Sequence, residues 1–144
     1  MINLTFYREY IENVAGRMTS RPAVLPVAVD KDMGKRIQSL PTGSVTVFLL
    51  PPGATSEARS ADAFRESNEC VLFVMEKYDT QRRRAFEVLE SSQPVIEELK
   101  SLLLADLSRG CAVMKIEVDS INTLPETEFF AGFAGWSLGF KVRT

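Results

Sequence analysis

The chain has 144 residues, of which 45% are hydrophobic and 25% charged, and its 17 basic and 19 acidic residues give a formal net charge of −2. This composition is that of an ordinary globular protein and excludes a disordered or fibrous chain, and the length fits one domain over residues 1–144. The charge balance offers no general attraction to nucleic acid or anionic lipid, so we do not expect nucleic acid as a partner.

Hydropathy and cysteine usage indicate the cellular setting. Apolar runs such as Val47–Leu50 and Val71–Met75 are far shorter than the ~20 residues of a membrane-spanning helix. The first residues carry charge and lack a basic leader, so they do not resemble a signal peptide. Cys70 and Cys111 each open a predicted buried strand, which is typical of buried free thiols. We therefore expect a cytoplasmic protein without membrane contact.

The N-terminal region predicts an amphipathic helix from Ile2 to about Thr19. Its apolar residues recur at helical spacing and should dock on a sheet: Leu4, Tyr7, Ile11, Val14 and Met18. The next apolar segment, Ala23–Val29, contains a proline and is therefore predicted as an edge strand. Lys31–Leu40 is predicted as a short helix.

A strand is predicted over Val45–Leu50, since the segment is rich in β-branched and large apolar residues and is followed by two prolines and a glycine. The segment Gly53–Glu69 is polar and is predicted as a long loop. Because long loops in compact domains often carry function, it is a candidate contact surface. The candidate contact residues in it are Ser56, Arg59 and Arg65.

Cys70–Met75 shows no polar alternation, which predicts a central strand covered on both faces. Asp79 or Thr80 can then cap a helix. Pro94 interrupts this helix, and it either kinks it or starts a second one. The apolar stripe that follows comprises Ile96, Leu99, Leu103 and Leu107, the solvated side comprises Glu97, Glu98, Lys100 and Asp106, and Gly110 is the expected stop.

The C-terminal region predicts two strands, Ala112–Asp119 and a closing strand, joined by a turn over Asn122–Glu128. In the closing strand, large apolar side chains alternate with small or charged ones. The expected core face is Trp136, Leu138, Phe140 and Val142, and the opposite face is Ser137, Gly139, Lys141 and Arg143.

The element order predicts an α+β fold. We expect one mixed, largely antiparallel sheet of about four to five strands, with the N-terminal helix and the long proline-broken helix packed on it. The strand from Cys70, the following helix and the strand from Cys111 could also form a parallel crossover unit.

The absence of histidine argues against an enzyme, because it removes the usual general base and the commonest metal ligand. The cysteines and carboxylates show no zinc or calcium spacing, so we expect neither metal nor cofactor. An enzyme would need carboxylates such as Glu76 and Asp119 to converge in a pocket with perturbed pKa values. This is the least favoured of the functions considered.

Two further clusters have a functional and a structural interpretation. Arg82-Arg83-Arg84 is predicted in the first turn of a helix, where the dipole disfavours cations, so it is either an anion-binding turn or a solvated basic turn. Gly132, Gly135 and Gly139 lack the context of a phosphate-binding loop and are interpreted as strand glycines that permit a bulge or a close backbone approach.

The aromatic residues near the C-terminus are too many for one buried face. Phe129, Phe130, Phe133, Trp136 and Phe140 fall within twelve residues. We expect most of them in the core, with Phe130 or Phe133 exposed to a partner subunit.

The ending Phe129–Phe140, preceded by an N-terminal helix and a β-rich middle, resembles small tail-terminator and tail-completion proteins of tailed phages and prophages. In many of these a glycine and a large aromatic open the last strand, positions that Gly135 and Trp136 occupy here. The resemblance implies a non-enzymatic subunit that forms a ring at the head-proximal end of the tail through sheet edges and loops. It carries over no catalytic residue.

These observations favour a structural assembly protein, a homo-oligomer that could also contact other phage-like tail or head proteins. It would contact itself through Gly53–Glu69 and the closing strand, with Phe130, Phe133 and Gly135 as candidates. The alternative is a small module that binds an anion or nucleic acid through Arg82–Arg84.

Overall fold

The computed structural model describes residues 1–28, 33–57, 59–110, 114–128 and 130–144. Its helices are α1 (Leu4–Arg17), α2 (Met33–Gln38) and α3 (Ala85–Ser108), with one 3₁₀ turn, η1 (Ala61–Ala63). Its strands are β1 (Ala23–Pro26), β2 (Val45–Leu49), β3 (Gly53–Ser56), β4 (Glu66–Lys77), β5 (Ile116–Glu126) and β6 (Phe133–Arg143).

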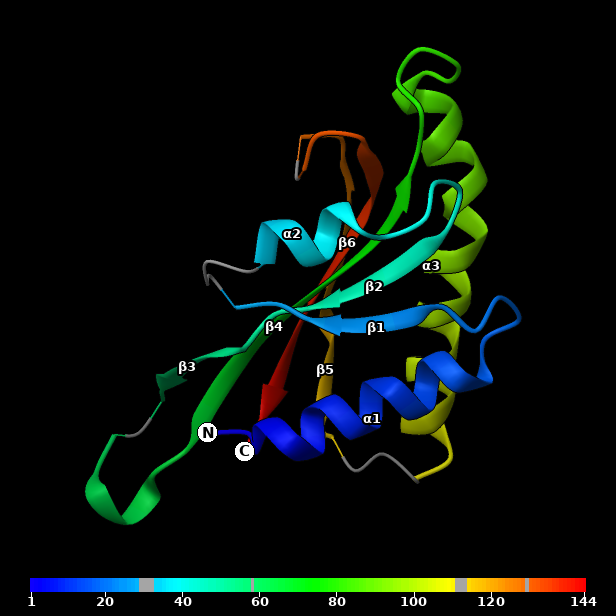
Figure 1. The fold of residues 1–144 in the computed structure, drawn as a ribbon. Coiled ribbons are helices and arrows are strands. Elements are labelled where there is room, and N and C mark those ends of the chain that lie inside the picture. Colours follow the sequence, from blue (N-terminus) through cyan, green and yellow to red (C-terminus); the bar gives the residue numbers. More distant parts are fainter. Residues whose placement is uncertain (29–32, 58, 111–113, 129) are drawn as a thin grey trace.

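The strands form one sheet in the order β1-β2-β4-β6-β5, and β3 is paired to β4 outside this path. Only the β1–β2 pair is parallel among the described pairs. Helices α1 and α3 pack against one face of the sheet, and α2 lies on the other (Figure 1). The predicted α+β class with a mixed, largely antiparallel sheet is confirmed, with six strands in place of four to five.

Helix α1 begins after Asn3, whose side-chain oxygen accepts a hydrogen bond from the Phe6 N–H at 3.0 Å. An asparagine at this position satisfies one of the free N–H groups of the first turn. Tyr7 and Ile11 are buried as the spacing predicts. Leu4, in the first turn, borders a surface pocket and is 52% exposed, so it is not part of the buried stripe.

Strand β1 lies at the edge of the sheet, as its prolines predict, and it pairs in parallel with β2. An edge strand tolerates Pro26 because one side of its backbone is outside the ladder. Helix α2 confirms the short helix predicted over Lys31–Leu40, although residues 31 and 32 lie outside the described part.

The prediction of a loop over Gly53–Glu69 is wrong at both ends of the segment, which are strands. Gly53–Ser56 pairs with Glu66–Glu69, so the segment is a β-hairpin that lengthens β4. All four residues of β3 are exposed, so the strand has no buried face and no alternation that a hydrophobic pattern could detect.

Strand β4 is central, as predicted, with β2 and β3 on one side and β6 on the other. Cys70, Leu72 and Val74 are buried on the helix side. On the opposite side Met75 is buried near α2, whereas Val71 and Phe73 are only half-buried. The expected cover on both faces therefore exists at one end of the strand only.

Helix α3 runs unbroken through Pro94 for 24 residues, so the second helix considered from the sequence does not form. The proline removes one N–H of the helix, the one that would bond to the carbonyl of Glu90. Buried residues on both sides of it, Val88 and Leu99 among them, share one face of the helix, and before the proline Trp136 of β6 donates its indole N–H to the Leu89 carbonyl at 3.1 Å. Packing of this face keeps the helix continuous across the proline.

The start of α3 also differs from the prediction. Asp79 accepts a hydrogen bond from the Gln81 N–H at 3.0 Å in a turn before the helix, and the helix begins only at Ala85. The Glu87 carboxylate accepts the Arg84 N–H at 2.9 Å. At the other end Gly110, with φ of 67°, provides the predicted stop.

Strand β5 extends to Glu126, so most of the turn predicted over Asn122–Glu128 is strand. The periodic pattern fails there because the register shifts between Glu117 and Asn122, and because Pro125 suggests a turn. Proline is tolerated because β5 is the other edge of the sheet. Strands β4 and β5 run parallel to each other with β6 between them, so the predicted crossover connects strands that are not adjacent.

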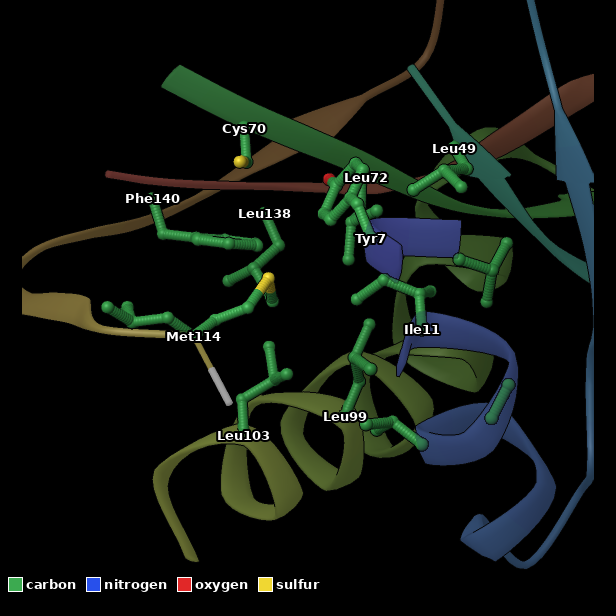
Figure 2. Close-up of a cluster of buried hydrophobic side chains, with 14 of the residues drawn as sticks. Tyr7, Ile11, Leu49, Cys70, Leu72, Leu99, Leu103, Met114, Leu138 and Phe140 are labelled. Atoms are coloured by element: carbon green, nitrogen blue, oxygen red, sulfur yellow. The ribbon is translucent and has the colours of Figure 1, made fainter. Parts of the chain in front are cut away.

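The main hydrophobic core lies between the sheet and the helices α1 and α3. Figure 2 shows Tyr7 and Ile11 of α1 and Leu99 of α3 meeting side chains of the sheet, including Leu72 and Leu138. A second, smaller core lies on the opposite face and contains Val27, Ile37, Phe48, Met75 and Phe133.

Candidate interaction surfaces

The hairpin formed by β3, η1 and the start of β4 projects from the body of the molecule (Figure 1). Its four ladder pairs continue with a hydrogen bond from the Glu57 N–H to the Arg65 carbonyl at 2.9 Å. The residues of the tip that the structure describes are exposed. Phe64, 61% exposed, is the only large apolar side chain among them.

The three contact candidates of this segment all lie on the hairpin. Ser56 ends β3, and Arg59 and Arg65 lie at the tip on either side of η1, all exposed. Neither arginine side chain forms an ion pair within the described ranges. The hairpin thus presents a phenyl ring and two arginines that have no ion pair in the described part of the chain.

A groove of about 350 Å³ lies on the sheet face that α1 and α3 leave uncovered. It runs across β4, β6 and β5, and its apolar lining includes Val71, Phe73 and Leu124. Leu124 is 54% exposed. Exposed apolar side chains gathered in a hollow with polar borders are typical of a contact site.

Polar groups form the floor and the border of this groove. The Ser137 hydroxyl donates to Glu126 Oε1 at 2.8 Å, and Lys141 lies 3.8 Å from Glu69. Glu126 has no cationic partner in the described part of the chain. At Gly139 a side chain would meet that of Asn122 at 2.9 Å, so the glycine leaves room for the amide.

The closing strand β6 has the two faces that its sequence predicts. Leu138, Phe140 and Val142 are buried against the helices, and Trp136 packs beside them. Ser137 and Gly139 face the groove. Because β4 and β5 pair with both of its edges, only this open face is available to a partner.

The contact candidates Phe130, Phe133 and Gly135, at the start of β6 and just before it, are buried or half-buried within the chain. The sequence predicts that Phe130 or Phe133 is exposed; Phe133 is 2% exposed and packs edge-on against Phe48, so for this residue the expectation is wrong. Phe130 is half-buried against the same small core. Gly135 is buried, and a Cβ there would lie 2.0 Å from the Val74 carbonyl oxygen. Its role within the chain is the close backbone approach between β6 and β4.

The three arginines precede α3 and point to different partners. Arg83 lies 3.2 Å from Glu76 and donates to the Ser91 hydroxyl at 2.8 Å. Arg82 lies 3.6 Å from Asp79 with a largely exposed side chain, and Arg84 is exposed at the N-cap of the helix. The predicted first-turn position is wrong, and one of the three cations is neutralised internally.

The carboxylates considered for catalysis do not converge. Glu76 is 8% exposed and lies opposite Ala134 in the β4–β6 register. Asp119 follows Glu117, which lies opposite Lys141 near the other end of β6. At about 3.3 Å per residue the two carboxylates are roughly 20 Å apart along the sheet. Within the described residues, no group of three or more Cys, Asp and Glu is placed to hold a metal ion.

The buried thiol of Cys70 is unsuited to nucleophilic chemistry. It lies in the main core, and burial raises its pKa to about 11. Because the thiolate is the reactive form, this environment favours an inert side chain. Cys111 lies outside the described residues.

A polar cluster between α1 and α3 was missed by the sequence, which predicted Asp106 on the solvated side. Arg17 donates to both carboxylate oxygens of Asp106, at 2.9 and 2.6 Å, and Tyr10 donates its hydroxyl at 2.8 Å. The hydrogen bonds from Arg17 hold the pKa of Asp106 below its usual value, and burial raises the pKa of Tyr10. The cluster joins the two helices through these hydrogen bonds, so it is a structural clamp.

No family model matches the chain, and no curated protein matches it significantly. In the part of the chain that the structure describes, none of the helices has the length and apolar character needed to cross a membrane.

Proposed function

We propose that this protein is a non-enzymatic structural subunit that assembles with copies of itself. The observation that carries the proposal is the pairing, in one chain, of a projecting hairpin with an exposed Phe64 and an uncovered sheet face with a half-apolar groove. Both features leave apolar area in water that an assembly would bury.

The setting proposed for this assembly is the tail or neck of a tailed phage or prophage. It rests on the resemblance of the ending, in which Gly135 and Trp136 lie near the start of the last strand. In this proposal the subunit forms a ring, contacts other tail or head proteins, and is cytoplasmic before it joins the virion. Electron microscopy of the purified protein tests the ring directly, because a closed annulus is expected and an irregular aggregate would contradict it.

Anion binding through Arg82–Arg84 is supported less well by the geometry. Arg83 turns toward Glu76 and Arg82 toward Asp79, so the three guanidinium groups do not form one free basic surface. An anion would have to compete with these carboxylates. Binding of a polyanion at low salt that is lost when the three arginines are replaced would favour this alternative.

The oligomeric state is the decisive measurement for the assembly proposal. Light scattering coupled to size exclusion, together with native mass spectrometry, should find an oligomer at tens of micromolar protein. A strict monomer under these conditions would contradict the proposal.

A further inference from the structure

We infer that the tip of the hairpin, residues 59–65, docks into the sheet-face groove of a second copy of the chain. The inference rests on the proposed self-assembly and specifies which two surfaces meet. In it Phe64 enters the groove bordered by Leu124, Phe73 and Glu126.

The two surfaces match in size and in chemistry. The groove holds about 350 Å³. A dry apolar cavity of about 150 Å³ is enough to bind benzene, so the groove has room for a phenyl ring and neighbouring atoms. Val71, Phe73 and Leu124 would remove the ring of Phe64 from water.

The charges are complementary as well. Within residues 59–65 Arg59 and Arg65 outnumber Asp62, which leaves this part net positive, and Glu57 at its base lies 3.9 Å from Arg143. Around the groove Glu69 and Glu126 outnumber Lys141, which leaves it net negative. A hairpin bound in the groove would bring an arginine close to Glu126, which has no cationic partner among the described residues. Charge pairing of this kind selects the partner and its orientation.

The hairpin cannot fill the groove of its own chain. Strand β4 passes from Glu66, at the base of the tip, to Val71 in the groove, a distance of roughly 16 Å along the strand. The tip extends from Glu66 away from the rest of β4 (Figure 1). Folding it back would break the β3–β4 ladder, so the occupant must come from another molecule.

Such a contact joins two different surfaces and is therefore head-to-tail. Every subunit offers its hairpin to one neighbour and its groove to another. Repetition of this contact closes a ring or extends a filament. The contact also leaves the helix-covered core unchanged.

Three single substitutions test the contact. Phe64→Glu disables the tip and Leu124→Glu disables the groove, and each should convert the oligomer to monomers in light scattering. Phe86→Glu is the matched control, because Phe86 is 70% exposed on α3 and lies outside both surfaces. It should assemble as the wild type does, and circular dichroism should show all three variants folded.

Mixing the two disabled variants separates this inference from other modes of association. The Leu124→Glu chain retains its hairpin and the Phe64→Glu chain retains its groove, so an equimolar mixture should form one-to-one heterodimers that neither variant forms alone. Native mass spectrometry distinguishes the chains by mass. Persistent oligomers of either variant, or a mixture that stays monomeric, would overturn the inference.

A charge exchange tests the pairing at the border of the groove. Arg65→Glu and Glu126→Arg should each weaken association about tenfold, and the double variant should recover most of the loss. Recovery is specific to contact between the two positions. A monomeric wild type would refute the proposed function together with this inference, whereas a wild-type oligomer that Phe64→Glu leaves intact refutes the inference alone.

Discussion

The two faces of the sheet differ in what covers them. On one face Leu72, Val74 and Leu138 are completely buried under α1 and α3. On the other face, Val71 and Phe73 of the same strand β4 remain half-exposed. Only toward the end of the strand, at Met75, does the small core beside α2 bury a side chain of this face. Adjacent residues of one strand thus contribute to different properties: the covered face stabilises the chain, and the open face is available to a partner.

The difference predicts that the same substitution has unequal effects on the two faces. Leu138 on β6 is fully buried, whereas Leu124 on the neighbouring strand β5 is 54% exposed. Leu138→Ala should lower the free energy of unfolding by about 2–5 kcal/mol, because it removes buried methyl groups and leaves a cavity. Leu124→Ala should change it by less than about 0.5 kcal/mol.

Urea unfolding of dilute protein measures the free energies of unfolding of Leu138→Ala and Leu124→Ala. The low concentration minimises the contribution of assembly to stability. Equal losses for the two variants would show that the open face is covered within the chain. The comparison between the faces would then fail.

The glycines of β6 provide a second, smaller contrast. A Cβ at Gly135 would lie 2.0 Å from the Val74 carbonyl oxygen, so Gly135→Ala must push β6 away from β4 and should cost about 3 kcal/mol. At Gly139 the nearest atoms belong to the Asn122 side chain, which can rotate into the groove. Gly139→Ala should stay within about 1 kcal/mol of the wild type.

Thermal unfolding of the two alanine variants measures this contrast. A melting temperature for Gly135→Ala near that of the wild type would mean that the two strands are not held so closely. A large decrease in melting temperature for Gly139→Ala would instead show that the Asn122 side chain on the open face is rigidly packed.

The hydrophobic pattern predicted the covered face well, because burial on one side imposes a period that a sequence retains. The buried stripe of α1 and the inner face of β6 follow from that period, whereas the central position of β4 follows from an apolar run without alternation. The same reasoning missed β3, whose side chains are all exposed and whose pairing depends on backbone hydrogen bonds alone.

Two other predictions from the sequence, at Pro94 and at Asp106, are wrong for a different reason that they share: tertiary contacts outweigh local preferences. Pro94 disfavours a continuous helix, yet α3 continues because its buried face extends on both sides of the proline. Asp106 has the polarity of a surface residue, yet it is 8% exposed because Arg17 and Tyr10 satisfy its carboxylate. The groove could not be predicted, since it depends on how far the helices extend over the sheet.

The smallest expected effect concerns the clamp that holds the two helices of the covered side together. Arg17 lowers the pKa of Asp106 in the folded chain, so the ionised form is stabilised by folding. This contribution is present above the usual aspartate pKa of about 3.9 and is lost as the pH falls through the lower folded value. Asp106→Asn, which keeps an acceptor for Tyr10, should therefore cost about 1–2 kcal/mol at pH 7.

The difference in unfolding free energy between wild type and Asp106→Asn should narrow below about pH 4, where the wild-type carboxylate takes up its proton. Urea titrations from pH 7 down to the lowest pH at which both proteins fold measure it. Glu97→Gln is the control, because Glu97 pairs with Lys100 in an exposed position and should change stability little at any pH. A gap that stays constant with pH would show that the contact joins the two helices through the geometry of its hydrogen bonds and not through the charge of Asp106.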